Sequence, residues 1–176
     1  MLGKVFRKDD INLLFGESGV GKTISSIKAL NKEGITPILL DFDYNDSQES
    51  NNCEYIHIDG YQFIEDKKSN IPSNEVIVVD TWQTFLDAGG DIKILNSIRD
   101  NNNTVILIAH NKAIATKQDI PDIDAKYANH FGSKLWLERI YSKKENKVHS
   151  ILHVKKCRGY KGSPVINDWQ RDDKII

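Results

Sequence analysis

The sequence contains Gly16-Glu17-Ser18-Gly19-Val20-Gly21-Lys22-Thr23, which fits the pattern G-x-x-x-x-G-K-[ST] at every fixed position. A short apolar run, residues 11–15, precedes this stretch and predicts a strand, and residues 23–32 carry apolar side chains at helical spacing. Glycines allow the backbone of such a turn to approach phosphate oxygens closely, and the N–H groups at the start of the following helix bind the anion. We therefore predict a phosphate-binding loop, or P-loop, over residues 16–23.

The P-loop pattern also indicates a ligand. Lys22 is expected to reach the β- and γ-phosphates of ATP, and the Thr23 hydroxyl is expected to ligate Mg²⁺. Every residue from Gly16 to Thr23 is thus a predicted nucleotide-binding residue, and ATP and Mg²⁺ are the predicted ligands. The alternative is a glycine-rich turn that binds nothing.

A second buried run ends in a carboxylate. Residues 76–79 are β-branched and apolar, and Asp80 follows them directly. In an α/β sheet, the carboxyl ends of the strands border the crevice that binds ligands. This pattern is typical of a Walker B strand, whose aspartate holds Mg²⁺ through water. The alternative is a solvated aspartate at a strand end.

Two further strand ends carry candidate catalytic residues. Asp41 and Asp43 end the strand that begins at Pro37, and by alternation their side chains point the same way. One would polarise the attacking water and the other would support the metal; we favour Asp43 over Asp41 as the base. His110 ends the run at residues 104–109 and is expected to face the γ-phosphate. The alternative for the aspartates is that they only stabilise a turn through hydrogen bonds to the backbone. The alternative for the histidine is a hydrogen-bonded surface position.

Short apolar strands alternate with helices over most of the chain, which predicts an α/β fold. Strands that are apolar on both faces favour a mostly parallel sheet with helices on either side. The predicted class is therefore an α/β P-loop NTPase. The expected elements are strands at residues 11–15, 37–40, 55–58, 75–79 and 104–109, and helices at residues 23–32 and 91–100.

The pattern changes after His110. Residues 112–128 are polar and contain Pro121, so they predict a long loop. Two alternating segments around a polar turn then predict a C-terminal β-hairpin. The remaining expectations are the hairpin at residues 135–142 and 147–156, a strand within residues 163–176, and one domain spanning residues 1–176 without an additional N-terminal domain.

Bulk composition narrows the class of protein. Hydrophobic residues make up 39% and charged residues 28%, as in ordinary globular domains. The net charge of -1 provides no global basic field for nucleic acid, although residues 143–162 are locally basic and residues 41–66 acidic. No apolar run approaches membrane-spanning length, so we expect no membrane partner. The two cysteines show no metal-binding spacing and favour a reducing, cytoplasmic setting.

Basic residues in the C-terminal half are candidate phosphate ligands. Lys156 and Arg158 are two residues apart, so on a strand they would share one face. They could stabilise charge that develops on a phosphate in a neighbouring subunit. Lys112, Lys117 and Lys126 lie in the predicted loop and could contact a phosphate backbone, although aspartates share that loop. The alternative for all of them is a solvated basic surface.

In their order along the chain, these motifs resemble those of RecA-type ATPases, especially the core of hexameric replicative helicases and small phage or plasmid RecA-like ATPases. The resemblance implies a RecA-like fold, ATP bound between subunits, and Lys156 and Arg158 acting across the interface. The family often carries Glu after its second strand where this sequence has Asp, which leaves the rate of hydrolysis open. The matching stretches are GESGVGKT (16–23), ILLDFD (38–43), VIVVDTWQTF (76–85), VILIAHNK (105–112), FGSKL (131–135) and VKKCRGYKG (154–162).

Three functions are compatible with these motifs. The resemblance implies a homo-oligomeric ATPase, for instance a hexameric ring, that acts on single-stranded DNA or RNA as a helicase, recombination or packaging motor. A P-loop kinase is the second, with Asp41 and Asp43 holding the hydroxyl of a small substrate. A nucleotide-binding regulatory protein with slow hydrolysis is the third. The expected location is the cytoplasm of a bacterial, archaeal or phage-infected cell.

Overall fold

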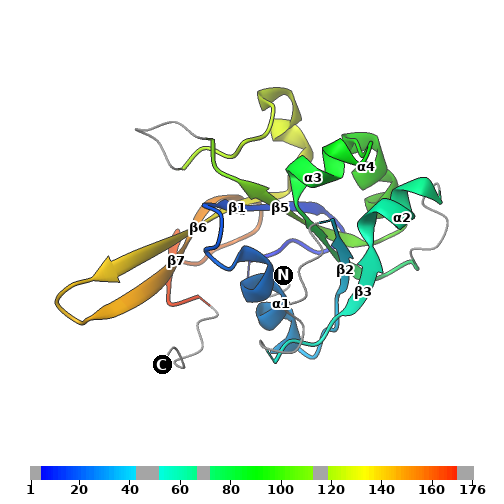
Figure 1. Ribbon diagram of the computed structural model, residues 1–176. Coiled ribbons are helices and arrows are strands. Elements are labelled where there is room, and N and C mark those ends of the chain that lie inside the picture. Colours follow the sequence, from blue (N-terminus) through cyan, green and yellow to red (C-terminus); the bar gives the residue numbers. More distant parts are fainter. Residues whose placement is uncertain (1–4, 43–51, 67–71, 113–118, 170–176) are drawn as a thin grey trace.

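A sheet of eight strands forms the centre of the protein (Figure 1). The computed structural model describes residues 5–42, 52–66, 72–112 and 119–169. The strands are β1 (Ile11–Gly16), β2 (Ile38–Asp41), β3 (Ile56–Asp59), β4 (Val76–Asp80), β5 (Thr104–His110), β6 (Ser133–Ser142), β7 (Lys147–Cys157) and β8 (Val165–Asn167). Their order is β3-β2-β4-β5-β1-β6-β7-β8. Every pairing from β3 to β6 is parallel, and the pairings β6–β7 and β7–β8 are antiparallel.

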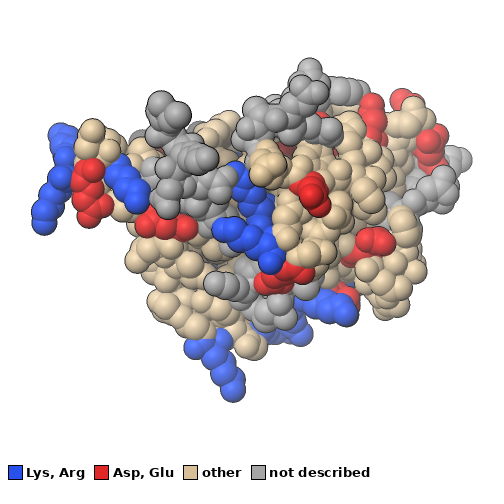
Figure 2. Space-filling view, turned by 90° about the horizontal axis from the view of Figure 1, so that it is seen from below, with Lys and Arg blue, Asp and Glu red and all other residues tan. Residues whose placement is uncertain are grey.

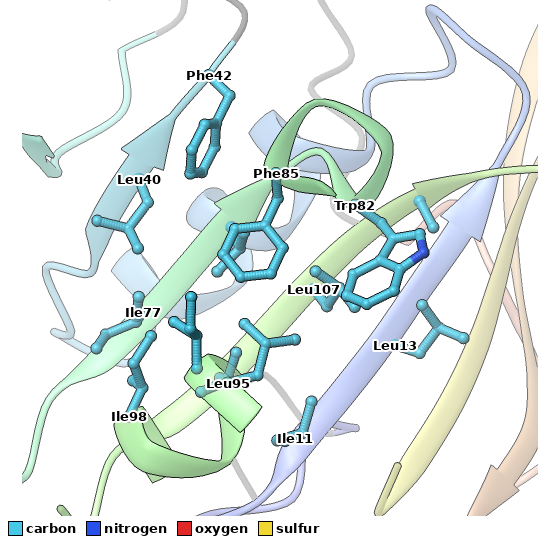
Figure 3. Close-up of a cluster of buried hydrophobic side chains, with 14 of the residues drawn as sticks. Ile11, Leu13, Leu40, Phe42, Ile77, Trp82, Phe85, Leu95, Ile98 and Leu107 are labelled. Carbon is cyan, nitrogen blue, oxygen red and sulfur yellow. The ribbon is translucent and has the colours of Figure 1, made fainter. Parts of the chain in front are cut away.

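Helices cover both faces of this sheet (Figure 1). One face packs on α1 (Lys22–Asn31) through a cluster that includes Leu14, Val78 and Ile106. The other face packs on three helices through Leu13, Ile77 and Leu107, and Figure 3 shows this cluster. Those helices are α2 (Gly60–Glu65), α3 (Trp82–Asp87) and α4 (Ile92–Asp100). Because neighbouring residues of each strand point to opposite faces, a fully apolar strand can supply both clusters at once.

The longest helix on the second face follows simple sequence rules. Asp91 is its N-cap, and the carboxylate accepts a hydrogen bond of 2.9 Å from the backbone N–H of Ile94. Ile94, Leu95 and Ile98 recur at helical spacing and are buried against the sheet, while the polar residues face outward. The sequence thus determines where α4 begins and which side it buries.

Most of the expected elements are confirmed, with boundaries shifted by two residues at most. The sequence did not reveal α2 and α3, because helices of six residues are too short to show a period. The expected loop after His110 contains a 3-10 helix, η1 (Ala125–His130), and residues 113–118 lie outside the described part. Within residues 163–176, the expected strand is confirmed as the short strand β8. Trp169 lies beyond this strand and packs edge-on against Phe6, with ring centroids 6.0 Å apart.

The core predicts a simple stability experiment. Ile106 is 0% exposed, so Ile106→Val removes one buried methyl group, and we expect the free energy of unfolding to fall by about 1 kcal/mol. The matched control is Ile140→Val, because Ile140 is 42% exposed and should lose almost nothing. Urea denaturation of both variants measures the difference, and equal losses would contradict the described burial.

Candidate functional site

The P-loop adopts the strand–turn–helix geometry that its sequence predicts. β1 ends at Gly16, and α1 begins at Lys22 with Gly21 as its N-cap. Gly21 has φ 81° and ψ 31°, a left-handed conformation that favours glycine. A Cβ at Gly16 would overlap the backbone carbonyl of Leu137 on β6, so this position also requires glycine. The N-terminus of α1 has no side-chain cap, so its backbone N–H groups could bind an anion at the turn.

Lys22 is held inside the loop. Its side chain is largely buried, and Nζ donates hydrogen bonds to the carbonyl oxygens of Gly16 (3.2 Å) and Glu17 (2.7 Å). Burial lowers the pKa of the ammonium to about 8 from its ordinary value of 10.5, and the negative charges of Asp80 and Glu17 partly oppose this decrease. The cation therefore lies at the centre of the loop, where phosphate oxygens could replace the two carbonyl oxygens as its hydrogen-bond acceptors.

This pKa predicts how anion binding depends on pH. Lys22 is charged below about pH 8 and loses its proton above it, whereas a bound phosphate favours the charged form and raises the pKa. Binding is therefore strongest below about pH 8, and we expect the Kd for ATP to rise by up to about tenfold per unit above it. Titration calorimetry from about pH 7.5 to about 9.5 measures this slope.

The matched variant for this titration is Lys22→Arg. A guanidinium stays charged over the whole range, so any pH dependence that originates at Lys22 should disappear. A wild-type Kd that stays constant across the range would contradict the lowered pKa.

A hydroxyl and a carboxylate meet next to the loop. The Thr23 hydroxyl donates a hydrogen bond of 2.6 Å to Oδ2 of Asp80, at the carboxyl end of β4. Asp41 ends β2 in register with Asp80, so the two carboxylates belong to neighbouring strands and the same face of the sheet. Hydroxyl and carboxylate oxygens are the ligands that Mg²⁺ prefers, so these residues fit the ion. Thr23 and Asp80 are the pair that would hold it.

An open cleft connects these residues. Its volume is about 360 Å³, within the range of small-ligand sites. One part is polar and contains the P-loop and the strand ends; the other part is mostly apolar and runs along α1 towards β2. The polar part is lined by Ser18, Gly19, Gly21, Lys22, Thr23, Asp41, Asp80, Thr81 and His110, and the other part by Ile24, Ile27, Leu39, Cys53 and Tyr55.

Most of the candidate residues named from the sequence meet at this cleft. The loop, Asp41, Asp80 and His110 come from four strand ends, and His110 pairs in register with Gly16. Asp43, which we favoured as the base, lies outside the described residues. Asp41 is 3% exposed and borders the cleft.

Lys156 and Arg158 are not brought to the loop of their own chain. Lys156 lies opposite Lys134 at the start of β6, and its Nζ donates to the carbonyl of Phe131 at 3.0 Å. The P-loop lies further along β6, beside Leu137 and Arg139. The expectation that both cations lie on a strand is wrong for Arg158, because β7 ends at Cys157 and Arg158 is exposed in the turn that follows.

Two residues near the cleft were not identified from the sequence. Arg139 on β6 donates from Nη1 to the carbonyl of Gly19 at 3.3 Å. His57 on β3 places Nε2 at 3.1 Å from Oδ2 of Asp41. Neither belongs to a motif, and both reach the site only through the pairing of distant strands. Only a prediction of the strand order could have found them.

Comparisons with known proteins define the fold. No model of a known protein family matches the sequence, and no curated protein sequence matches it. Among solved structures, the RadB recombinase is similar with a TM-score of 0.63 and 15% identity, over 92% of this chain and 87% of that chain. The flagellar accessory protein FlaH from Methanocaldococcus jannaschii gives 0.58 and 11%, over 92% and 85%. A KaiC-like protein from Pyrococcus horikoshii OT3 gives 0.56 and 11%, over 90% and 84%.

These similarities, together with the sheet order and the P-loop, show that the chain has the fold of RecA-like ATPases. The resemblance inferred from the motifs is therefore confirmed at the level of the fold. Within the described ranges, none of the helices has the length and apolar character needed to cross a membrane.

Proposed function

We propose that the protein binds Mg·ATP in the P-loop cleft and hydrolyses it. The observation that carries this proposal is the hydrogen bond of 2.6 Å between Thr23 and Asp80, directly beside the buried Lys22. Lys22 and the N–H groups at the start of α1 would bind the phosphates, and Thr23 and Asp80 would hold Mg²⁺. When bound, Mg²⁺ neutralises charge on the phosphate oxygens.

The strand ends provide groups for the chemical step. Asp41 borders the cleft and would orient and deprotonate the attacking water, with Asp43 as the alternative base. His110 borders the same cleft beside the loop and would contact the γ-phosphate. ADP has no γ-phosphate and could not make this contact, so His110 would distinguish ATP from ADP.

We further propose that a second copy of the chain completes the site. Lys156 and Arg158 lie away from the loop of their own chain, so they can act on a phosphate only in a neighbouring subunit. Arg158 is exposed in a turn, as such a role requires. A homo-oligomer, for example a hexameric ring, would place these cations at the next cleft.

We propose single-stranded nucleic acid as the partner. The end of the β6–β7 hairpin projects from the body of the protein (Figure 1), and Figure 2 shows Lys and Arg side chains at that end. Lys143, Lys144 and Lys147 are all exposed there. Contacts of this kind to phosphates are tolerant of sequence and weaken with salt.

The direct test measures ATP hydrolysis with and without single-stranded DNA and RNA, at low salt and over a range of protein concentrations. Turnover per subunit that rises with protein concentration supports a shared site, and a rise with polynucleotide supports the nucleic-acid partner. Arg158→Ala should lower turnover by about 10³ if it acts as a finger, while the exposed neighbour Lys161→Ala should not. Absence of ATP hydrolysis under all conditions would contradict the proposed enzyme.

A second candidate function, a small-molecule kinase, is favoured by one observation. Besides the phosphate loop and Asp41, the lining of the cleft includes Ile24, Leu39 and Tyr55, which form an apolar part. A small substrate could occupy the apolar part with its hydroxyl near Asp41. Transfer of labelled γ-phosphate to a nucleoside or another alcohol, without release of free phosphate, would favour this function over hydrolysis.

A further inference from the structure

Asp41 has a side-chain partner that the proposed reaction does not yet use. His57 places its Nε2 at 3.1 Å from Oδ2 of Asp41, within hydrogen-bond distance. The Asp41 side chain is only 4% exposed, whereas that of His57 is 40% exposed. Asp41 lines the cleft and His57 does not, so His57 contacts a lining residue without lining the cleft itself.

The sheet determines this arrangement. β2 and β3 run parallel, with Leu39 opposite His57 and Asp41 opposite Asp59. Side chains at positions 39, 41 and 57 consequently project from the same face, which is the face that carries α1 and the P-loop. His57 approaches Asp41 diagonally from the neighbouring strand, a distance that a long or aromatic side chain can span.

A buried carboxylate can adopt several orientations about its terminal torsion, and only some of them direct a lone pair at a water next to the γ-phosphate. A hydrogen bond to one oxygen removes this freedom. With His57 bound to Oδ2, the carboxylate plane would be held in one orientation, and this orientation would direct the carboxylate at the attacking water. Residues that orient a reacting group in this way typically contribute about 10- to 100-fold to activity.

The geometry points to His57 as a positioning residue for Asp41, the residue that the proposed reaction uses as its base. His57 donates its Nε2–H to Oδ2 and does not contact the nucleotide itself. This inference rests on the proposed hydrolysis, which it deepens by naming the group that orients the base. The role of His57 is to fix the orientation of the Asp41 carboxylate. The affinity for nucleotide is therefore expected not to depend on His57.

A pair of substitutions of similar volume tests this role. His57→Gln keeps an N–H donor that can reach Asp41, and His57→Leu removes the donor. We expect His57→Leu to lower kcat about tenfold with KM nearly unchanged, and His57→Gln to recover most of the loss. His149→Leu is the matched control, because His149 also contacts carboxylates, Glu145 and Asp168, but on the hairpin outside the cleft.

A second measurement does not require turnover. Mg·ADP with aluminium fluoride imitates the phosphoryl group during attack, whereas Mg·ADP alone reports nucleotide affinity. His57→Leu should weaken the aluminium fluoride complex about tenfold and leave the Kd for Mg·ADP within about twofold. Far-UV circular dichroism and the thermal midpoint check that each variant is folded.

The outcomes separate this inference from the proposed function. If the wild type hydrolyses ATP and His57→Leu equals it in kcat and in aluminium fluoride binding, His57 has no positioning role. If His57→Leu and His57→Gln lower kcat by the same factor, His57 has a structural role and not the proposed positioning role. If the wild type shows no turnover, hydrolysis is contradicted, and the aluminium fluoride ratio still decides whether His57 orients Asp41.

Discussion

Lys22→Ala is expected to lower ATP turnover by about 10³-fold, because it removes the buried cation at the centre of the P-loop. The ammonium contacts the carbonyl oxygens of Gly16 and Glu17, and as the positively charged group of the loop it could stabilise the negative charge of the transferred phosphate. The truncation should also weaken binding of Mg·ATP. Steady-state kinetics together with calorimetric Kd values separate these two losses.

The control for this substitution is Lys32→Ala. Lys32 lies at the C-cap of the same helix and is exposed, so the substitution removes one positive charge without changing a residue of the loop. We expect its turnover to be within about twofold of the wild type. Equal losses in the two variants would indicate a general effect of charge and would contradict the role of Lys22.

Asp80→Asn is expected to lower Mg²⁺-dependent turnover by on the order of 10²-fold. The substitution preserves shape, and the amide oxygen can still accept the hydrogen bond of Thr23, but the negative charge that attracts the ion is lost. The fold should therefore survive while the metal dependence changes. Wild-type binding of ATP should tighten with Mg²⁺, and binding to the variant should be nearly the same with Mg²⁺ or with chelator.

The matched control is Asp87→Asn at the exposed end of α3. It makes the same chemical change on the opposite face of the sheet, away from Thr23. Turnover and its Mg²⁺ dependence should equal those of the wild type. A variant of Asp80 that keeps the full response to Mg²⁺ would exclude this carboxylate as a metal ligand.

The parts of the site that could be predicted are those that the chain encodes locally. The P-loop is contiguous, and its glycines, lysine and threonine follow from the close approach of backbone to phosphate. Asp80, Asp41 and His110 could be predicted almost as well, because each is the last residue of a buried strand, and parallel strands bring their carboxyl ends to one edge.

The remaining features depend on long-range pairing. Arg139 reaches Gly19 across 120 positions of sequence because β6 pairs with β1, and a short apolar pattern gives no information on which strands become neighbours. His57 meets Asp41 for the same reason, through the pairing of β2 with β3. The helices α2 and α3 are stabilised by tertiary packing of Phe63 and Phe85 rather than by local periodicity, so the sequence alone did not reveal them.

The contact between β6 and the P-loop makes the hairpin a lever. The carbonyl of Leu137 lies against Gly16, Arg139 binds the carbonyl of Gly19, and the same strand continues outward to the exposed turn at residues 143–146. A force applied at that turn would therefore reach the P-loop along a continuous strand. Conversely, a change in the shape of the loop around phosphate would act on β6 at two points, and a small displacement there would become a larger one at the far end of the hairpin.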